Sequence, residues 1–291
     1  MKTASRSNLL IFLIIVAGFF LVSQVSLSNA ATLKDRLLNN FKTIEKPAEP
    51  LLPASVKIAP GFALGKGYSV GNVQMVQGDV VVVHKGESSA YKLTENAPIF
   101  NGDLLVSMEK SRANIKLNDK SVFSMAPHTR LLVDKVKYDP VNNKRETKMS
   151  LNFGRARFIA NKLSAESKFN VKTPTAVAGV RGSDFGLAVT TGEFPKSSCS
   201  VLRMLSHLTL VSEAHAALPG LLTTLVTGPA TNVSFAGPLG AAKTVTAFSV
   251  SAASVGQAAM IPMYVGPMAA AGALGAVGAN LASIDMPAGM K

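Results

Sequence analysis

The sequence contains no tryptophan, one cysteine, four tyrosines and four histidines among 291 residues. Because Cys199 is alone, it excludes an internal disulfide framework and a dithiol redox centre, and we interpret it as an incidental free thiol. The fold must therefore be held together by its core. The scarcity of aromatic side chains that could stack on bases argues against nucleic acid as a partner, although the formal net charge is +13.

The residue patterns of common hydrolases and metalloenzymes are also missing. His207 and His215 are eight residues apart, whereas a zinc-binding helix places two histidines four residues apart, and His84 and His128 each stand alone. The segment RGSDFG lacks the G-x-S-x-G spacing of a nucleophile elbow. We therefore expect no enzymatic activity, no cofactor and no metal.

The first thirty residues have the pattern of a secretory signal. A short basic segment precedes the uncharged apolar run 9–22, and Ser28 and Ala30 are the small residues that signal peptidase requires. We expect cleavage after Ala30 and localisation in the periplasm or cell envelope. The alternative is an uncleaved N-terminal membrane anchor, which the short apolar run disfavours.

After such cleavage the chain would keep 28 basic and 17 acidic residues, a formal charge of +11. The expected partner of an exported basic protein is an envelope protein or an acidic envelope polymer, with peptidoglycan and lipopolysaccharide as candidates. A charge that serves only solubility is the alternative. The sequence does not define the oligomeric state.

Changes in composition divide the chain into five parts. These are a signal peptide (1–30), an amphipathic helix with a proline-rich arm (31–68), a β domain (69–192), a mixed extension with strand-like segments (193–243) and an uncharged Ala/Gly-rich tail (244–291). Helical spacing of apolar residues predicts the helix, and four prolines at positions 47–60 break regular structure in the arm. The helix places four apolar residues on one face: Leu33, Leu37, Leu38 and Phe41.

The β domain consists of short runs rich in valine, leucine and phenylalanine, separated by Gly, Asn, Asp and Pro. Alternation of apolar and polar residues, as at Ile115 and Leu117, gives each run one apolar face. The pattern predicts an all-β, mainly antiparallel fold: a meander, a roll or a solenoid-like sandwich. We expect the C-terminal extension to be partly helical or irregular.

The tail contains 41 consecutive residues without a charge, positions 244–284. Three interpretations remain open: a mobile or loosely docked tail, a segment docked against the β domain, and a membrane-spanning helix. We rank them in that order, since Pro262 and Pro267 interrupt the run and Ala and Gly insert weakly into membranes.

The segment VKTPTAVAGVRGSDFGLAV, Val171 to Val189, resembles the hallmark of the FecR domain family. Ser183 departs from the threonine usual there. Upstream, NGDLLVSMEKSRANIKLNDKSVFSMAPHTRLLV is similar to the family's turn and strand pattern, so that the resemblance covers about residues 70–190. The matching positions of the hallmark are Thr173, Pro174, Ala176, Ala178, Val180, Arg181, Gly182 and Phe185.

The resemblance implies a FecR-like β fold but not a particular function. The best-known members are single-pass regulators with a cytoplasmic segment that controls a sigma factor, and only a few residues precede the apolar run in this sequence. We therefore do not expect the sigma-regulator role.

The hallmark itself is interpreted as a structural signature, with a ligand grip as the alternative. Its glycines allow tight turns, and the guanidinium of Arg181 is expected to be partly buried against backbone carbonyls or a carboxylate such as Asp184. The signature comprises Thr173, Pro174, Val180, Arg181, Gly182, Ser183, Asp184 and Phe185.

These observations predict a non-enzymatic periplasmic or envelope module that binds or interacts with a partner, with sensing or scaffolding as its role. The alternative is a structural or assembly component of the envelope, in which the tail mediates self-association or anchoring.

Overall fold

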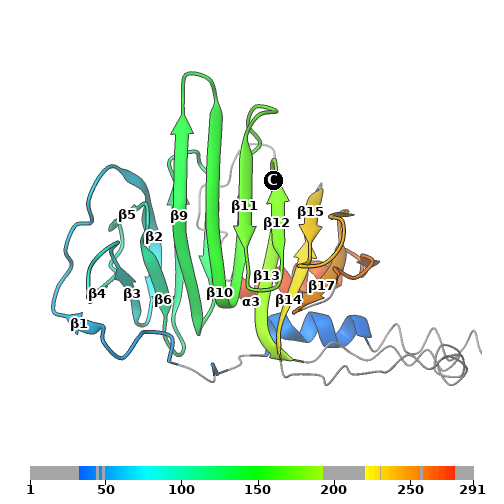
Figure 1. The fold of residues 1–291 in the computed structure, drawn as a ribbon, viewed down its shortest axis with the longest axis horizontal. Helices are drawn as coiled ribbons and strands as arrows, with labels where there is room; N and C mark the ends of the chain where they lie inside the picture. The colour runs from blue at the N-terminus through cyan, green and yellow to red at the C-terminus, as the bar shows by residue number, and fades with distance from the viewer. Residues whose placement is uncertain are drawn as a thin grey trace, which may run out of the picture.

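The computed structural model describes residues 33–43, 46–47, 50–192, 220–229, 231–255 and 258–278 (Figure 1). The expected signal peptide, Cys199, His207 and His215 lie outside the described residues. The described chain is an all-β sandwich of two sheets with two short helices, which confirms the predicted fold class.

The first sheet contains ten strands, and its pairs are antiparallel except β1 with β4 and β10 with β11. In spatial order they are β1 (Lys57–Ala59), β4 (Ser89–Lys92), β3 (Val80–Val83), β6 (Leu104–Ser107), β9 (Thr129–Asp139), β10 (Lys144–Ala160), β11 (Lys168–Lys172), β12 (Val177–Val180), β15 (Val233–Ala236) and β16 (Lys243–Val245).

The second sheet is entirely antiparallel and shares β10 with the first. In spatial order its strands are β5 (Pro98–Phe100), β2 (Ser69–Gln77), β7 (Arg112–Leu117), β8 (Val122–Met125), β10, β13 (Ser183–Gly192), β14 (Gly220–Thr227), β17 (Ser249–Ser254) and β18 (Met263–Tyr264).

Strand β10 passes from one sheet to the other. Its first part pairs with β9 and β11 in the first sheet, and its last seven residues pair with β13 in the second. Gly154 marks the change, with φ of +89°, and a Cβ there would lie 2.4 Å from the carbonyl oxygen of His128. Only glycine fits such a backbone without strain. The long β9–β10 hairpin extends beyond its neighbours in Figure 1.

The main core fills the space between the sheets. It combines residues of the first sheet, such as Val82 and Leu151, with residues of the second, such as Val73 and Ile115, all fully buried. The ring of Phe158 in the second sheet lies 6.1 Å from that of Phe169 in the first. Alternating apolar residues therefore build one continuous core, as the sequence pattern predicts.

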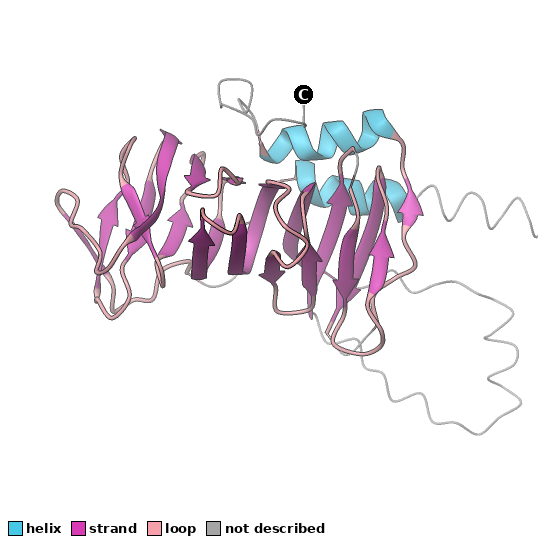
Figure 2. Cartoon of the chain, turned by 90° about the horizontal axis from the view of Figure 1, so that it is seen from above, coloured by secondary structure: helices cyan, strands magenta, loops and turns pink. Residues whose placement is uncertain are grey.

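Two helices cover the outer face of the second sheet, lying together on one side of the molecule in Figure 2. They are the segment 33–42 and α3 (Pro267–Val277). Leu37 and Phe41 of the first helix are 1% exposed, which confirms the predicted apolar face. The helices approach the sheet at Gly186, where a Cβ would lie 2.9 Å from both Phe41 and Leu274.

An arginine from the second sheet caps the C-terminal end of each helix. Arg155 of β10 donates to the carbonyl oxygens of Phe41 and Thr43, at 3.2 and 2.6 Å. Arg112 of β7 donates to the carbonyl oxygen of Ala276 at 2.9 Å. Each cation lies at the negative end of a helix dipole, which is the stabilising arrangement.

The proline-rich arm covers part of the first sheet's outer face. Leu51, Leu52 and Val56 pack against a small buried cluster that includes Val81 and Val106. This cluster lies on β3, β4 and β6, so the arm protects the N-terminal portion of the sheet.

The uncharged tail is docked over its described part, and the first-ranked interpretation of a mobile or loosely docked tail is wrong for residues 244–255 and 258–278. All six residues of β17 are buried in the second sheet, and α3 buries Ala270, Ala273, Leu274 and Val277. Small uncharged residues suit a strand that has the core on one face and helices on the other. Among the described residues, no helix has the length and apolar character needed to cross a membrane.

Candidate functional site

The predicted signature residues lie at the two ends of β12. Thr173 and Pro174 belong to the turn that joins β11 to β12, while Arg181 and Gly182 form the corner where the chain leaves the first sheet. Ser183 begins β13 in the second sheet. The hallmark residues therefore lie before and after β12, and those after it lie where the chain crosses from the first sheet to the second.

At the first of these ends, hydroxyl groups link the turn to the second sheet. The backbone N–H of Thr173 donates to the carbonyl oxygen of Ala176 at 2.8 Å, and the Thr173 hydroxyl accepts from the Ala176 N–H at 2.9 Å. The same hydroxyl lies 2.8 Å from that of Thr223 on β14. Since Pro174 has no N–H to donate, the ladder ends here without leaving an unsatisfied donor.

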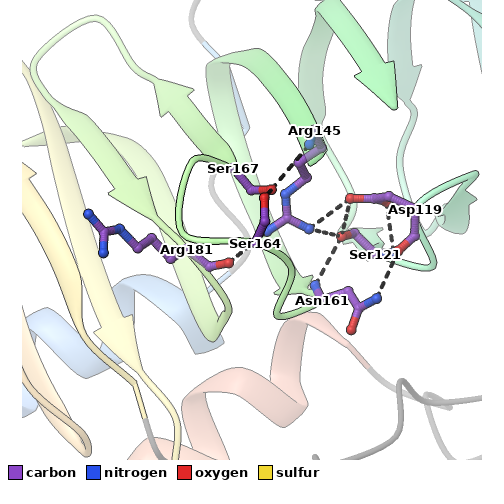
Figure 3. Close-up of polar contacts among 7 residues, drawn as sticks. All are labelled: Asp119, Ser121, Arg145, Asn161, Ser164, Ser167 and Arg181. Carbon is purple, nitrogen blue, oxygen red and sulfur yellow. Dashed lines mark hydrogen bonds and ion pairs between the residues drawn. The ribbon is translucent and has the colours of Figure 1, made fainter. Parts of the chain in front are cut away.

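At the second end, a fully buried arginine holds the corner (Figure 3). Arg145 of β10 donates to a carboxylate oxygen of Asp119 at 2.7 Å, to the hydroxyl of Ser121 at 2.8 Å and to the carbonyl oxygen of Arg181 at 3.0 Å. The side chains of Arg145 and Asp119 are both 0% exposed. The guanidinium also lies over the ring of Phe169, 5.1 Å from its centroid.

This group joins three loops of the same rim, and we call it the Arg145 cluster: Asp119, Ser121, Arg145, Asn161 and Ser167, with the carbonyl of Arg181. The side-chain amide of Asn161 donates to the Asp119 carbonyl oxygen at 3.0 Å, and its backbone N–H donates to the Ser121 hydroxyl at 3.0 Å. The Ser167 hydroxyl accepts from the backbone N–H of Arg145 at 3.1 Å. Both terminal nitrogens of the Arg145 guanidinium are hydrogen-bonded within the cluster, whereas its Nε is buried without a hydrogen-bond partner among the described residues. The cluster acts as a structural connection.

The expectation that the Arg181 guanidinium is partly buried against backbone carbonyls or a carboxylate such as Asp184 is wrong. Asp184 is bound by Arg157, through Nε at 2.9 Å and Nη2 at 2.6 Å, in a two-point contact between β10 and β13. The side chain of Arg181 is exposed and points away from the Arg145 cluster in Figure 3. Alternation along β13 explains the difference, because Asp184 faces the outside of the second sheet and Phe185 faces the core.

Gly182 and Phe185 occupy tightly packed positions. A Cβ at Gly182 would lie 2.7 Å from Cα of Lys162 in the neighbouring loop, so a larger residue would push the two loops apart. The ring of Phe185 stacks on that of Phe158 at 5.2 Å and meets Phe169 edge-on at 6.4 Å. Both observations are consistent with a structural role for the hallmark.

Among the described residues, the outer face of the first sheet carries exposed side chains beyond the part that the arm covers. Six exposed lysines lie on three adjacent strands, and one of them, Lys144, is paired with Glu166. We call the surface of the other five the lysine face: Lys135 and Lys137 on β9, Lys148 on β10, and Lys168 and Lys172 on β11.

The strand register places these side chains together. Lys135 lies opposite Lys148, and Glu146 lies opposite Lys137 on one side and Lys168 on the other. Residues directly opposite in a sheet share a face.

Glu146 is the acid within this surface. It accepts from Lys135 at 2.6 Å and lies 3.0 Å from Lys148. These contacts, Lys135 first, lower the pKa of Glu146 to about 2. The carboxylate thus stays ionised under all ordinary conditions and neutralises part of the lysine charge.

A second buried polar pair lies under the arm. His84 Nδ1 is 2.8 Å from Asp103 Oδ1, and His84 Nε2 is 2.9 Å from the carbonyl oxygen of Ala63. A carbonyl only accepts, so Nε2 must carry a proton and ties the arm to β3. Burial raises the pKa of Asp103, and hydrogen bonds from His84 and the Phe100 N–H oppose that rise.

Within the described part of the chain, no three His, Cys, Asp or Glu side chains gather in a group that could hold a metal ion. His84 is committed to the Asp103 pair, and His128 is in a turn at positive φ. The candidate sites among the described residues are therefore exposed surfaces, since the buried polar clusters serve the structure.

One comparison with known proteins agrees with the hallmark. A family model described as FecR protein matches residues 103–202, which confirms the FecR resemblance over that part of the chain. The match includes the hallmark and begins at the β5–β6 turn. No curated protein matches this chain.

Two crystal structures of a candidate anti-sigma factor from Parabacteroides distasonis ATCC 8503 also align with the chain. The sequence identities are 11% and 12%, and the TM-scores are 0.37 and 0.36. Each alignment covers 55% of this chain and 59% of the other, so the chain spans about three fifths of the length of those proteins.

Sequence reasoning missed Arg145 and the lysine face, although both leave a signal. In the run from Arg145 to Leu151, every second residue points inward, and Arg145 is on the same face as Met149 and Leu151. An arginine in register with core residues requires a buried acceptor. Lys148 has the opposite parity and therefore points outward.

Proposed function

We propose that this chain is an exported, non-enzymatic FecR-domain protein that acts as a binding or interaction module in the periplasm or cell envelope. The observation that carries the proposal is the unequal covering of the sandwich. Helices 33–42 and α3 cover the outer face of the second sheet, whereas the first sheet presents the lysine face. The signal-like N-terminus and the basic composition support the envelope as the location.

The test is recovery of a partner from the native envelope. Tagged full-length chain is expressed in its host, the envelope is fractionated, and co-purifying components are identified. We expect a specific component to be retained by the wild-type chain and by a control with Lys66, Lys110 and Lys120 changed to Gln. Recovery of no component from any envelope fraction contradicts the proposal.

A second candidate function is a structural or assembly component, and one observation favours it. Large apolar side chains are exposed near the C-terminal edge of the sandwich, where the short edge strands β16 and β18 end the two sheets. Edge strands and apolar patches are common sites of self-association. The exposed residues are Leu239, Val255, Ile261, Tyr264 and Met268.

The oligomeric state separates the two functions. Deletion of the tail is unsuitable, because it removes β17 and α3 from the second sheet and uncovers its core. The better variant changes Ile261 and Met268, which are 75% and 89% exposed, to Lys. If the wild-type chain is a large assembly by light scattering and this variant is a monomer, the structural function is favoured. A monomeric wild type favours the binding module.

A further inference from the structure

Four arginines of the described sandwich are engaged within the protein. Arg112 and Arg155 cap the two helices, Arg157 binds Asp184, and Arg145 binds Asp119. Their charges therefore stabilise the fold and leave little for a partner. The lysines of the first sheet differ in this respect.

Three lysines of the lysine face make no ion pair within the ranges that the structure describes: Lys137, Lys168 and Lys172. Lys135 and Lys148 share Glu146. Two other acids lie on β9: Asp134 accepts a hydrogen bond from the Ser150 hydroxyl, and Asp139 at the end of the strand interacts electrostatically with Lys137. The face therefore carries more positive than negative charge, and among the described residues Lys168 and Lys172 have no ion-pair partner that offsets theirs.

The register also opposes like charges, because Lys135 and Lys148 lie directly across from one another. Such pairs are destabilising in a sheet. Glu146 relieves the repulsion only in part, since one carboxylate serves two ammonium groups. An external anion would neutralise the remaining charge.

The arrangement suits an extended ligand. Lys168 and Lys172 are four residues apart on β11, so their Cα atoms are roughly 13 Å apart along the strand. Lys148 lies across from Asn170, midway between them on the next strand. The lysine ammonium groups are thus spread along the strand direction, and the distance between the outer two is greater than the length of one small anion.

The composition of the face argues against two other anionic partners. The exposed large apolar residues beside it are Val177, 42% exposed on β12, and Val141, 90% exposed in the β9–β10 turn. These two side chains give little to insert into a lipid layer. The exposed side chains of β10 and β11 include no aromatic ring that could stack on nucleic-acid bases.

We propose that the lysine face is the binding site for a linear acidic polymer with repeated carboxylate or phosphate groups. The inference rests on the proposed function, because it assigns a partner class and a surface to the envelope module. Lys137, Lys168 and Lys172 supply the contacts, and Glu146 limits the affinity by holding the other two lysines.

The test uses the purified full-length chain with poly-L-glutamate and inorganic polyphosphate as probes, at low salt, by isothermal titration calorimetry. One variant changes Lys137, Lys168 and Lys172 to Gln. The matched control changes three exposed lysines elsewhere, Lys66, Lys110 and Lys120, to Gln. A third variant, Glu146→Gln, frees Lys135 and Lys148.

The face variant should bind about a hundredfold more weakly, since each lysine near an anionic surface contributes about fivefold. The control should lose much less, and Glu146→Gln should bind several-fold more tightly. Circular dichroism and thermal melts establish that all variants fold.

Equal losses in the face variant and the control would overturn the proposal, because binding would then follow net charge alone. Binding to phosphatidylglycerol vesicles in place of both polymers would also overturn it and would identify a lipid surface. If the polymers fail to bind but an envelope component is still retained by the face variant, this inference fails while the proposed function stands.

Discussion

Removal of the buried Arg145 guanidinium should strongly destabilise the fold. In Arg145→Ala, the carboxylate of Asp119 would remain 0% exposed without its cation, and the carbonyl of Arg181 would lose its donor. Breaking one side of a buried ion pair typically costs about 3–5 kcal/mol. For a protein of this size each kcal/mol corresponds to about 2–4 °C, so the melting temperature should fall by about 6–20 °C.

The matched control is Arg181→Ala. Its side chain is exposed, and its backbone carbonyl still accepts from Arg145, so the free energy of unfolding should change by less than about 0.5 kcal/mol. Urea unfolding followed by circular dichroism measures both variants. A loss below about 1 kcal/mol in Arg145→Ala, or equal losses in the two variants, would refute the role of the Arg145 cluster.

A double-mutant cycle sharpens the test. Asp119→Ala alone leaves the guanidinium buried without its carboxylate, whereas the double variant removes both charges. The double variant should therefore cost less than the sum of the two single variants, by at least about 1 kcal/mol. Additive losses would mean that the two side chains stabilise the corner independently.

Three further predictions concern other parts of the sandwich. Gly154→Ala should lower the free energy of unfolding in urea by about 3 kcal/mol or more, because the new Cβ would clash with the His128 carbonyl and φ is positive. A loss under about 1 kcal/mol would contradict the conclusion that β10 passes between the sheets at this residue. His84→Ala should cost about 1–3 kcal/mol and speed trypsin cleavage after Lys66, because Asp103 loses its partner and the arm its tie to β3; unchanged cleavage would show that the arm is held by other contacts. The pKa of Glu146 falls from 4.5 to about 2 on folding, so its contribution to stability is complete above pH 4.5 and is lost as the pH falls toward 2. The urea midpoint of the wild type should thus decline more steeply over that window than that of Glu146→Gln, and parallel curves would count against the ion pairs.

Periodicity predicted the elements that bury one face. The helix 33–42 follows from the spacing of Leu37 and Phe41, and strands such as β7 follow from alternation at Ile115 and Leu117. These patterns report burial of individual side chains, which is a local property. They say less about which sheet a strand joins, and β10, which belongs to both sheets, is the clearest case.

The docking of the tail and the ion-pair partner of Asp184 could not be predicted without knowledge of the tertiary structure. β17 has the composition of a flexible segment, yet its small residues are what a strand needs when packed on both faces. Asp184 is close to Arg181 in sequence, but its partner comes from β10 across the sheet. Proximity along the chain is a poor guide to ion pairs in a sheet, because neighbouring residues alternate between faces while strand neighbours share one.

Arginine and lysine occupy different positions in this sandwich, and the difference links the fold to the proposed function. Arginine can hold several acceptors at fixed angles, and the buried and half-buried positions of this sandwich use arginine for carboxylates and helix ends. Lysine is a flexible, well-hydrated point charge, and it occupies the open face at Lys168 and Lys172. A surface that binds one rigid ligand would be expected to carry arginines in place of these lysines. Flexible lysines above a rigid sheet favour a repetitive anion that can bind in several registers, and the salt dependence of polymer binding should therefore follow the lysines and leave the arginine contacts unchanged.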